Sequence, residues 1–359
     1  MKLFAAASVA LCAVAWAGWT PVLAEGAKLC DKPRQMEGFK TCANVEKAEA
    51  EGAFTLYSTD PEQGQVKLLA AFNKMFPKIK TSYVRLQAGA LYAKVLSERQ
   101  AKSYLVDVIQ ISDMGMILDF QRRGGFRQYV SPQMAAFKPE YKSKPEGFWT
   151  WGSIIMAGIA YNPNNVAAAE APKKWEDLLD PKWKDAINVK VSNSGLQHGV
   201  WYMLKPILGM DYFKKFGEQK PRAFDSYVQQ YGRLVDGQDK IIMGAQYSGY
   251  IEFKAKGAPL AFVFPSTGVP AVSETYGIVA DGPHPNAAEL FMDWFLAPVG
   301  QQALSDALLL HSPRDDVPAP AGSVPLKDMK LLIPADWNAF EKDRPEFAKE
   351  WDRIVGARR

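Results

Sequence analysis

The sequence predicts an α/β protein built from two similar lobes. Three segments in the first half of the chain each run from an apolar strand through a short polar loop into a helix. Repeated units of this kind form a parallel sheet whose loops meet at one edge. A second set of strands and helices follows a long apolar strand over residues 153–161. With 359 residues, 48% of them hydrophobic, the chain is long enough for two cores and has a globular composition.

The three units of the first lobe lie between Phe54 and Gly125. In each unit, apolar side chains form the strand and then repeat at helical spacing beyond the loop. Strands are expected over 54–57, 81–86 and 105–111, and their loops read Ser58-Thr59-Asp60, Gln87-Ala88-Gly89 and Ser112-Asp113. The third helix ends at Gly124-Gly125, which is a usual stop signal.

The second lobe begins where Trp149, Trp151 and Gly152 precede the strand over 153–161. This strand is long and apolar, so we expect it to cross from one lobe to the other. The segment Trp175-Glu176-Asp177-Leu178-Leu179, a strand over 187–191 and the loop Ser192-Asn193-Ser194-Gly195 follow, and a helix comes next. The two lobes share a pattern but no repeat at the level of the sequence.

The N-terminus has the pattern of a secretory signal peptide. Lys2 precedes an apolar run from Leu3 to Trp19, and Val22-Leu23-Ala24 places small residues where a signal peptidase reads. A membrane anchor is the alternative, but Gly18 and Pro21 interrupt the run and no basic flank follows it. We expect residues 1–24 to be removed after Ala24 and the protein to be exported to the periplasm.

Export also predicts the state of the cysteines. Without residues 1–24 the chain keeps only Cys30 and Cys42, in an N-terminal extension over residues 25–50. Disulfides persist in exported proteins, so we expect these two cysteines to be bonded to each other.

Charge and motifs argue against several classes of function. The formal net charge is +4, with acidic and basic residues interspersed, so nothing indicates binding to nucleic acid or to a membrane surface. The three histidines, His198, His284 and His311, are far apart, and no zinc-protease, nucleophile-elbow or phosphate-loop motif is present. His198, at the start of a helix, either reaches the cleft or lies partly exposed on that helix. No cofactor is indicated.

The loops at the carboxyl ends of the strands are the candidate site. Each leads into a helix N-terminus, where unpaired backbone N–H groups favour anions or polarised oxygens. The alternative is that Asp60, Asp113 and Ser194 only cap their own helices. Several such loops facing one cleft would form a binding site.

Several words of the sequence, in their order, resemble the extracellular solute-binding proteins of ABC importers, and more narrowly the branch that binds ferric iron, phosphonates and sugar phosphates. They are Phe54-Thr55-Leu56-Tyr57-Ser58, Tyr161-Asn162-Pro163, Trp175-Glu176-Asp177-Leu178, Pro181-Lys182-Trp183-Lys184, Lys256-Gly257-Ala258-Pro259, and Phe291-Met292-Asp293-Trp294-Phe295. The resemblance extends over nearly all of the chain from about Glu51.

This resemblance implies a type II periplasmic binding protein, with two α/β lobes hinged by two crossing strands. Lobe 1 would comprise residues 51–152 and about 262–308, and lobe 2 residues 153–261 and about 309–359. Such a protein closes on one small-molecule ligand and passes it to an ABC permease in the inner membrane. We expect a monomer without enzymatic activity, and a secreted enzyme on the same scaffold is the remote alternative.

The segment over 244–260 bears on the choice of ligand. Ferric-binding relatives carry two adjacent tyrosines just before a turn resembling Lys254-Ala255-Lys256-Gly257-Ala258-Pro259, but the aligned positions here hold Ser248 and Gly249. Tyr247 and Tyr250 flank that gap and are the alternative metal ligands. In an extended stretch, however, their side chains would point to opposite faces. The sequence therefore favours an anionic, oxygen-rich organic solute, with ferric iron as the alternative.

Two more segments contribute candidates. The turn Pro265-Ser266-Thr267-Gly268 lies where the chain of the related proteins returns to the first lobe and lines the cleft. The alternative is a plain turn. Arg85, Glu274 and Arg314 are charged groups that a ligand could pair with. Trp151 could form a wall of the cleft. The predicted ligand-binding set is Ser58, Thr59, Ala88, Gly89, Ser112, Trp151, Ser192, Ser194, Gly195, Tyr247, Ser248, Ser266 and Thr267.

Overall fold

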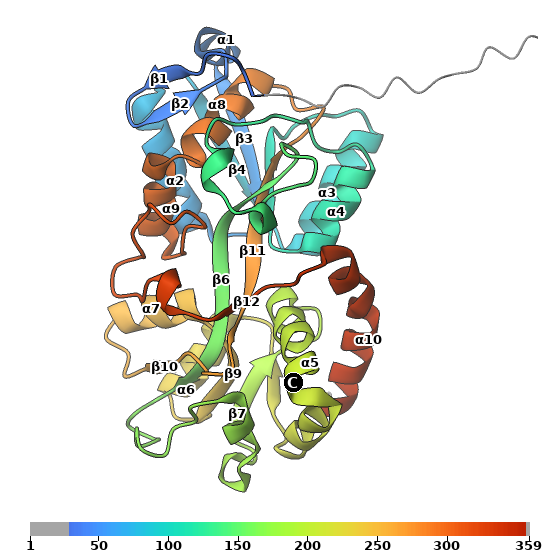
Figure 1. Ribbon diagram of the computed structural model, residues 1–359, viewed down its shortest axis with the longest axis vertical. Coiled ribbons are helices and arrows are strands. Elements are labelled where there is room, and N and C mark those ends of the chain that lie inside the picture. The colour runs from blue at the N-terminus through green and yellow to red at the C-terminus, as the bar shows by residue number, and fades with distance from the viewer. Residues whose placement is uncertain (1–28, 357–359) are drawn as a thin grey trace, which may run out of the picture.

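Two long strands, β6 (Thr150–Tyr161) and β11 (Val269–Ile278), run from one lobe into the other (Figure 1). The computed structural model describes residues 29–356. Its large sheet has the order β4-β3-β5-β11-β6-β9-β7-β8, with β10 beside β6 and β12 beside β11. β6 and β11 pair with each other antiparallel and are buried along their whole length. They form the predicted hinge of a two-lobed α/β fold.

Lobe 1 contains the three predicted strand-to-helix units. Strands β3 (Ala53–Ser58), β4 (Lys80–Arg85) and β5 (Val108–Ile111) are parallel. Helices α2 (Glu62–Met75), α8 (Pro285–Phe295) and α9 (Pro298–Leu308) cover one face of the sheet. Helices α3 (Ala88–Gln100) and α4 (Met114–Arg122) cover the other (Figure 1). β5 is antiparallel to β11, and β11 is antiparallel to β6, which runs from lobe 1 into lobe 2. The carboxyl ends of the parallel strands therefore point toward lobe 2.

Lobe 2 repeats this arrangement of parallel strands between helices. Strands β7 (Ile187–Lys190), β8 (Arg222–Phe224) and β9 (Ile241–Gln246) are parallel, and β10 (Ala261–Val263) pairs with β6. Helix α5 (Gly195–Glu218) lies on one side, and α6 (Tyr227–Val235) and α7 (Tyr247–Ala255) on the other (Figure 1). Short 3₁₀ turns occupy Met134–Ala136, Pro139–Tyr141, Trp175–Leu179, Pro181–Trp183 and Leu326–Asp328.

The C-terminal segment lies against the hinge and then crosses between the lobes. After α9 the chain forms β12 (Leu331–Leu332), parallel to β11, and ends in α10 (Trp337–Val355). Phe347 and Trp351 of α10 are buried in the core of lobe 2. The start of the same helix reaches α4 of lobe 1 (Figure 1).

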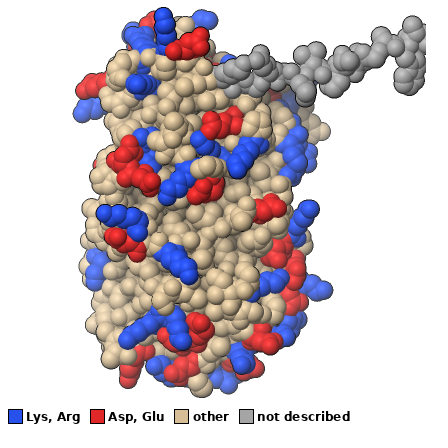
Figure 2. Space-filling view, viewed as in Figure 1, with Lys and Arg blue, Asp and Glu red and all other residues tan. Residues whose placement is uncertain are grey.

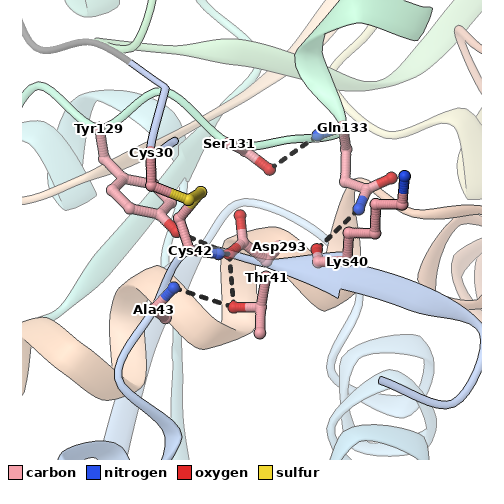
Figure 3. Close-up of a disulfide and its surroundings, with 9 residues drawn as sticks. All are labelled: Cys30, Lys40, Thr41, Cys42, Ala43, Tyr129, Ser131, Gln133 and Asp293. Carbon is pink, nitrogen blue, oxygen red and sulfur yellow. Dashed lines mark hydrogen bonds between the residues drawn. A yellow bond between two sulfur atoms is a disulfide. The ribbon is translucent and has the colours of Figure 1, made fainter. Parts of the chain in front are cut away.

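The N-terminal extension is fastened to lobe 1. Strands β1 (Arg34–Met36) and β2 (Phe39–Thr41) form a hairpin, and α1 (Val45–Glu51) follows. A disulfide joins Cys30 to Cys42 with Cα atoms 5.8 Å apart, which confirms the predicted bond (Figure 3). The predicted signal peptide over 1–24 lies outside the described residues.

Removing this disulfide is expected to destabilise the protein moderately. The bond closes a loop with a sequence separation of 12 residues. In the chain-entropy description, such a loop contributes about 3 kcal/mol to the free energy of unfolding. The paired variant Cys30→Ser/Cys42→Ser should show this loss in urea titrations without loss of the fold, since lobe 1 has its own core. An unchanged midpoint would mean that the extension is held by its other contacts alone.

The surface agrees with the interspersed charges of the sequence. In the face viewed in Figure 2, acidic and basic side chains alternate over both lobes. Within residues 29–356 no helix combines the length and the apolar character needed to cross a membrane.

Candidate functional site

Loops of the two lobes meet beside the hinge. A methyl group placed on Gly195, at the start of α5, would lie 3.5 Å from the carbonyl oxygen of Ser112, which follows β5. Arg344 of α10 lies between the same two loops, because it pairs with Asp113 at 2.8 Å and donates to the carbonyl of Asn193 at 3.4 Å. The structure therefore brings the predicted loops after β5 and β7 together across the two lobes.

A second meeting point lies at the ends of β4 and β8. Arg85, the last residue of β4, is exposed, and its side chain has no hydrogen-bond or ion-pair partner within residues 29–356. Its positive charge acts on Tyr227 of lobe 2 and opposes the rise in the pKa of that phenol. Burial and then the Glu252 carboxylate, which accepts from the Tyr227 hydroxyl at 2.9 Å, raise that pKa. A guanidinium of lobe 1 thus lies within electrostatic range of a phenol of lobe 2.

Lys190 adds a second cation to this region. It ends β7, its ammonium donates to the carbonyl of Asp225 at 3.1 Å, and it lies 5.9 Å from the ring centre of Tyr227. Burial lowers its pKa to about 8. The ammonium is therefore mostly charged at neutral pH, and an anion beside it would stabilise the charged form further.

Two buried carboxyl groups lie where the loop after β3 meets the hinge. Asp60 and Glu274 lie close enough to shift each other's pKa and are 3% and 5% exposed. Ser153 donates to Glu274 at 2.6 Å, and Gln65 donates to Asp60 at 2.7 Å. Burial raises the pKa of both carboxyls, and the charge of Asp60 adds to the rise for Glu274. The pair therefore keeps a proton at a higher pH than two separate carboxyls would.

The loop after β3 is bound to its own lobe. Ser58 is fully buried and donates to the side-chain oxygen of Gln110 at 2.7 Å. The backbone N–H and the hydroxyl of Thr59 donate to the same oxygen at 2.8 and 2.9 Å. Of the two, only Thr59 is partly exposed.

The remaining strand-end candidates differ in their exposure and in their hydrogen bonds. Gly89 is exposed, with open space where a side chain would be, and Ala88 beside it is half-buried. Ser192 and Ser194 are half-buried, and Ser194 caps α5 by accepting from Gln197 at 3.4 Å. Asp113 caps α4 in the same way. The expected cap by Asp60 is absent, because its carboxyl bonds to Gln65 inside α2 instead.

Tyr247 and Tyr250 lie on a helix, so the prediction that they occupy an extended stretch was wrong. Helix α7 begins at Tyr247, which places the two phenols on one face, with ring centres 5.7 Å apart. Tyr247 is 2% exposed, packs against Phe262 and Phe264, and accepts from the N–H of Val324 at 3.1 Å. It is part of an aromatic cluster behind the hinge strands.

The two positions that hold tyrosines in ferric-binding relatives are shaped differently here. Ser248 is half-buried and accepts from the side chain of Gln246 at 2.9 Å. A methyl group on Gly249 would lie 2.8 Å from ring carbons of both Tyr227 and Tyr231, closer than atoms normally approach. A larger side chain at 249 would require α6 to move, since both rings belong to that helix.

Three other candidates lie elsewhere. Trp151 is fully buried, with ring centres of Tyr141 and Trp337 at 4.8 and 5.6 Å. Ser266 and Thr267 lie in the turn before β11, close to β12, where Trp175 donates to the carbonyl of Gly268 at 3.1 Å. None of the three is brought to the loops after β5 and β7 by the contacts above.

His198 and Arg314 already make their contacts within the protein. The expectations for His198 were wrong, since it neither reaches the cleft nor lies exposed: it is fully buried, with its ring centre 4.1 Å from that of Phe340. Burial lowers its pKa to about 3, so it is neutral. Arg314 forms two hydrogen bonds to Asp316 and lines a cavity of about 880 Å³ in the C-terminal segment.

The sequence did not single out Lys190, Tyr227 or Arg344. Lys190 ends β7 and lies one residue before the end of the predicted strand over 187–191, which is a usable signal because the loops were already chosen by that rule. Tyr227 follows the short β8, and Arg344 lies on a C-terminal helix far along the chain. Nothing local marks either one.

Residues 29–356 contain no cluster of three or more His, Cys, Asp or Glu side chains that could hold a metal ion.

Comparison with known proteins identifies the family of the chain. The model of the bacterial extracellular solute-binding protein family matches residues 103–343. The chain belongs to this family. An uncharacterised protein of Haemophilus influenzae is 24% identical to this solute-binding protein over 272 residues, which cover 71% of this chain and 76% of that protein.

Solved structures support the fold. Iron-bound HitA from Pseudomonas aeruginosa matches the solute-binding protein with a TM-score of 0.73 at 18% identity, covering 85% of this chain and 99% of that one. The periplasmic binding protein AfuA from Actinobacillus pleuropneumoniae, with fructose-6-phosphate bound, has the same TM-score and coverage at 21% identity. The chain is thus a two-lobed type II periplasmic binding protein, the solute-binding component of an ABC importer.

Proposed function

We propose that the protein captures a small, oxygen-rich organic anion between its lobes and delivers it unchanged to an ABC permease. The observation that carries this proposal is Arg85, whose exposed guanidinium has no hydrogen-bond or ion-pair partner in residues 29–356 and whose charge acts on Tyr227 of the other lobe. A guanidinium pairs with carboxylate or phosphate oxygens through two parallel hydrogen bonds. Lys190 and the helix N-termini after Gln87 and Ser194 add further donors.

The carboxyl pair supports a ligand that also carries hydroxyl groups. Asp60 and Glu274 lie beside this region, and the charge of Glu274 acts on Tyr227. A carboxyl pair that retains a proton can both donate to and accept from a hydroxyl group. The charge that the pair retains repels any anionic group, so a ligand whose hydroxyl groups lie apart from its anionic group fits better than a simple inorganic anion. We therefore favour phosphate esters, phosphonates and hydroxy acids.

Ferric iron is the second candidate, because iron-bound proteins are among the structures of the same fold. Against it stand the crowded Gly249 and the position of Tyr247, whose hydroxyl accepts from Val324. Tyr250 stacks on Tyr247 in the same cluster. Two phenolate ligands would require these rings to leave their packing.

The candidate ligand set follows from these positions. We propose Thr59, Ala88, Gly89, Ser112, Ser192, Ser194, Gly195 and Ser248 as contacts, together with Arg85, Lys190 and Tyr227. Ser58, Trp151, Tyr247, Ser266 and Thr267 would act by supporting the site. We further propose that the protein is a monomer without enzymatic activity, that its lobes divide as the sequence indicates, and that the signal peptide is cleaved after Ala24.

The melting temperature of the periplasmic protein, refolded to remove carried-over ligand, should identify the ligand class. The panel contains phosphate esters, phosphonates, hydroxy acids and ferric citrate. A ligand at about 100 times its dissociation constant adds about 2.7 kcal/mol to the free energy of unfolding, which raises the midpoint measurably. We expect an organic anion to raise it and to be recovered unchanged by mass spectrometry. A rise with ferric citrate alone would favour iron, and a converted ligand would favour an enzyme.

A further inference from the structure

Helix α10 is anchored in lobe 2. The rings of Phe347 and Trp351 pack on Trp201 of α5, with centres 5.7 and 6.4 Å away. Asp343 accepts from the Trp201 indole at 3.1 Å and from Lys205 at 3.3 Å. Such aromatic packing and buried hydrogen bonding keep a helix with its lobe when the lobes move.

The first turns of α10 contact lobe 1. Arg344 pairs with Asp113, the cap of α4, at 2.8 Å, and its side chain is 25% exposed. Glu341 lies against Gly115, where an added methyl group would overlap its carboxylate at 1.7 Å. Arg344 also donates to Asn193, which precedes α5 in lobe 2. One side chain thus joins the loops of both lobes.

We propose that α10 is a closure latch, in which Arg344 holds Asp113 of lobe 1 when the lobes are closed and releases it when they open. Since α10 moves with lobe 2, rotation about β6 and β11 must change its distance to α4. Asp113 is not left unpaired in the open state, because its other oxygen accepts from Gly115 and Met116 of its own helix. Release therefore costs one ion pair and no unsatisfied cap.

Glu341 makes the latch sensitive to pH. Three charged groups act on its carboxyl: Asp113 at the start of α4, Arg122 at the end of α4, and Arg344 on its own helix. Burial, followed by the charge of Asp113, raises its pKa from the ordinary 4.5 to about 7. One of its oxygens is buried without a hydrogen-bond partner among the described residues.

The sign of the pH effect follows from this environment. Opening exposes Glu341 and returns its pKa to the ordinary range, so the closed state binds the proton more tightly. The contribution of Glu341 to closure is complete below pH 4.5 and is lost as the pH rises through about 7. Closure should therefore weaken between pH 5.5 and pH 8, by about thirtyfold in the closed-to-open ratio.

Single-molecule energy transfer tests the latch without any ligand. Dyes are placed on Ser97→Cys in α3 and Gln229→Cys in α6, both exposed, in protein recovered from the periplasm. Arg344→Gln should lower the closed-to-open ratio about fivefold, the effect of one partly exposed ion pair. Arg353→Gln is the matched control, since its exposed pair with Glu350 lies within α10. It should change nothing.

A second variant keeps the test decisive if Arg344→Gln does not fold. Glu341→Gln, which stays neutral, should hold the ratio constant from pH 5.5 to pH 8 while the parent loses closure. The latch is overturned if Arg344→Gln folds and closes like the parent, if Glu341→Gln keeps the parent's pH response, or if the ligand-free parent is open at every pH. None of these readings depends on the identity of the ligand.

Discussion

Arg85→Glu is expected to weaken binding of the organic anion at least about 100-fold. The arginine has no partner within residues 29–356, so its charge is available to a ligand in the cleft. Reversing that charge removes a paired guanidinium and places a carboxylate against the anion, and such losses amount to about 3 kcal/mol or more. Isothermal titration with the ligand found by thermal shift measures the change.

Lys80→Glu provides the matched control for this prediction. Lys80 opens the same strand, β4, is also exposed, and lies at the end of the strand away from the cleft. The two variants change the net charge equally, so a general effect of charge would appear in both. Equal affinities for the parent and Arg85→Glu would show that the anion does not bind at this end of β4.

The strand-to-helix units were predictable because their signals are local. Apolar runs followed by polar loops and helical periodicity identified β3, β4 and β5, and the sheet places β3 between the other two. The third strand was expected from residue 105 but begins at Val108, because Leu105 is exposed before the chain enters the sheet. Such boundaries depend on tertiary burial, which periodicity does not record.

The candidate site was harder to predict, because its groups come from distant segments. Asp60 and Glu274 form one carboxyl pair only when β11 returns beside the loop after β3. The charge of Arg85 acts on Tyr227 only because the lobes face each other. A search restricted to strand-end loops therefore found Thr59 and Ser194 and did not find Tyr227 or Arg344.

The tyrosines of α7 show how one boundary changes an interpretation. The loss of the adjacent pair was visible in the sequence at Ser248 and Gly249, and the structure adds that position 249 has no room for a ring. The direction of Tyr247 and Tyr250 depended on where the helix begins. Because it begins at Tyr247, both rings pack on one side, and their spacing follows helical periodicity instead of strand alternation.

Asp293→Ala is expected to cost about 4 kcal/mol of unfolding free energy, more than loss of the disulfide. One fully buried carboxylate oxygen accepts from the hydroxyls of Thr41 and Tyr129, each at 2.6 Å, and from the N–H of Cys42 at 2.9 Å (Figure 3). Alanine leaves these donors unsatisfied, at about 1–3 kcal/mol each, partly offset because burial already raises the pKa of the carboxyl. Urea titration measures the loss.

A control variant, and the combination of Asp293→Ala with loss of the disulfide, test whether the effect is specific to Asp293. Asp306→Ala removes an exposed carboxylate of α9 that only accepts from Gln302, and it should change stability little. Asp293 and the disulfide hold the same segment at Cys42, so their effects should not add. Once the extension is released by Asp293→Ala, opening the disulfide should cost less than it does in the parent. Full additivity would instead mean that the extension and lobe 1 are stabilised independently.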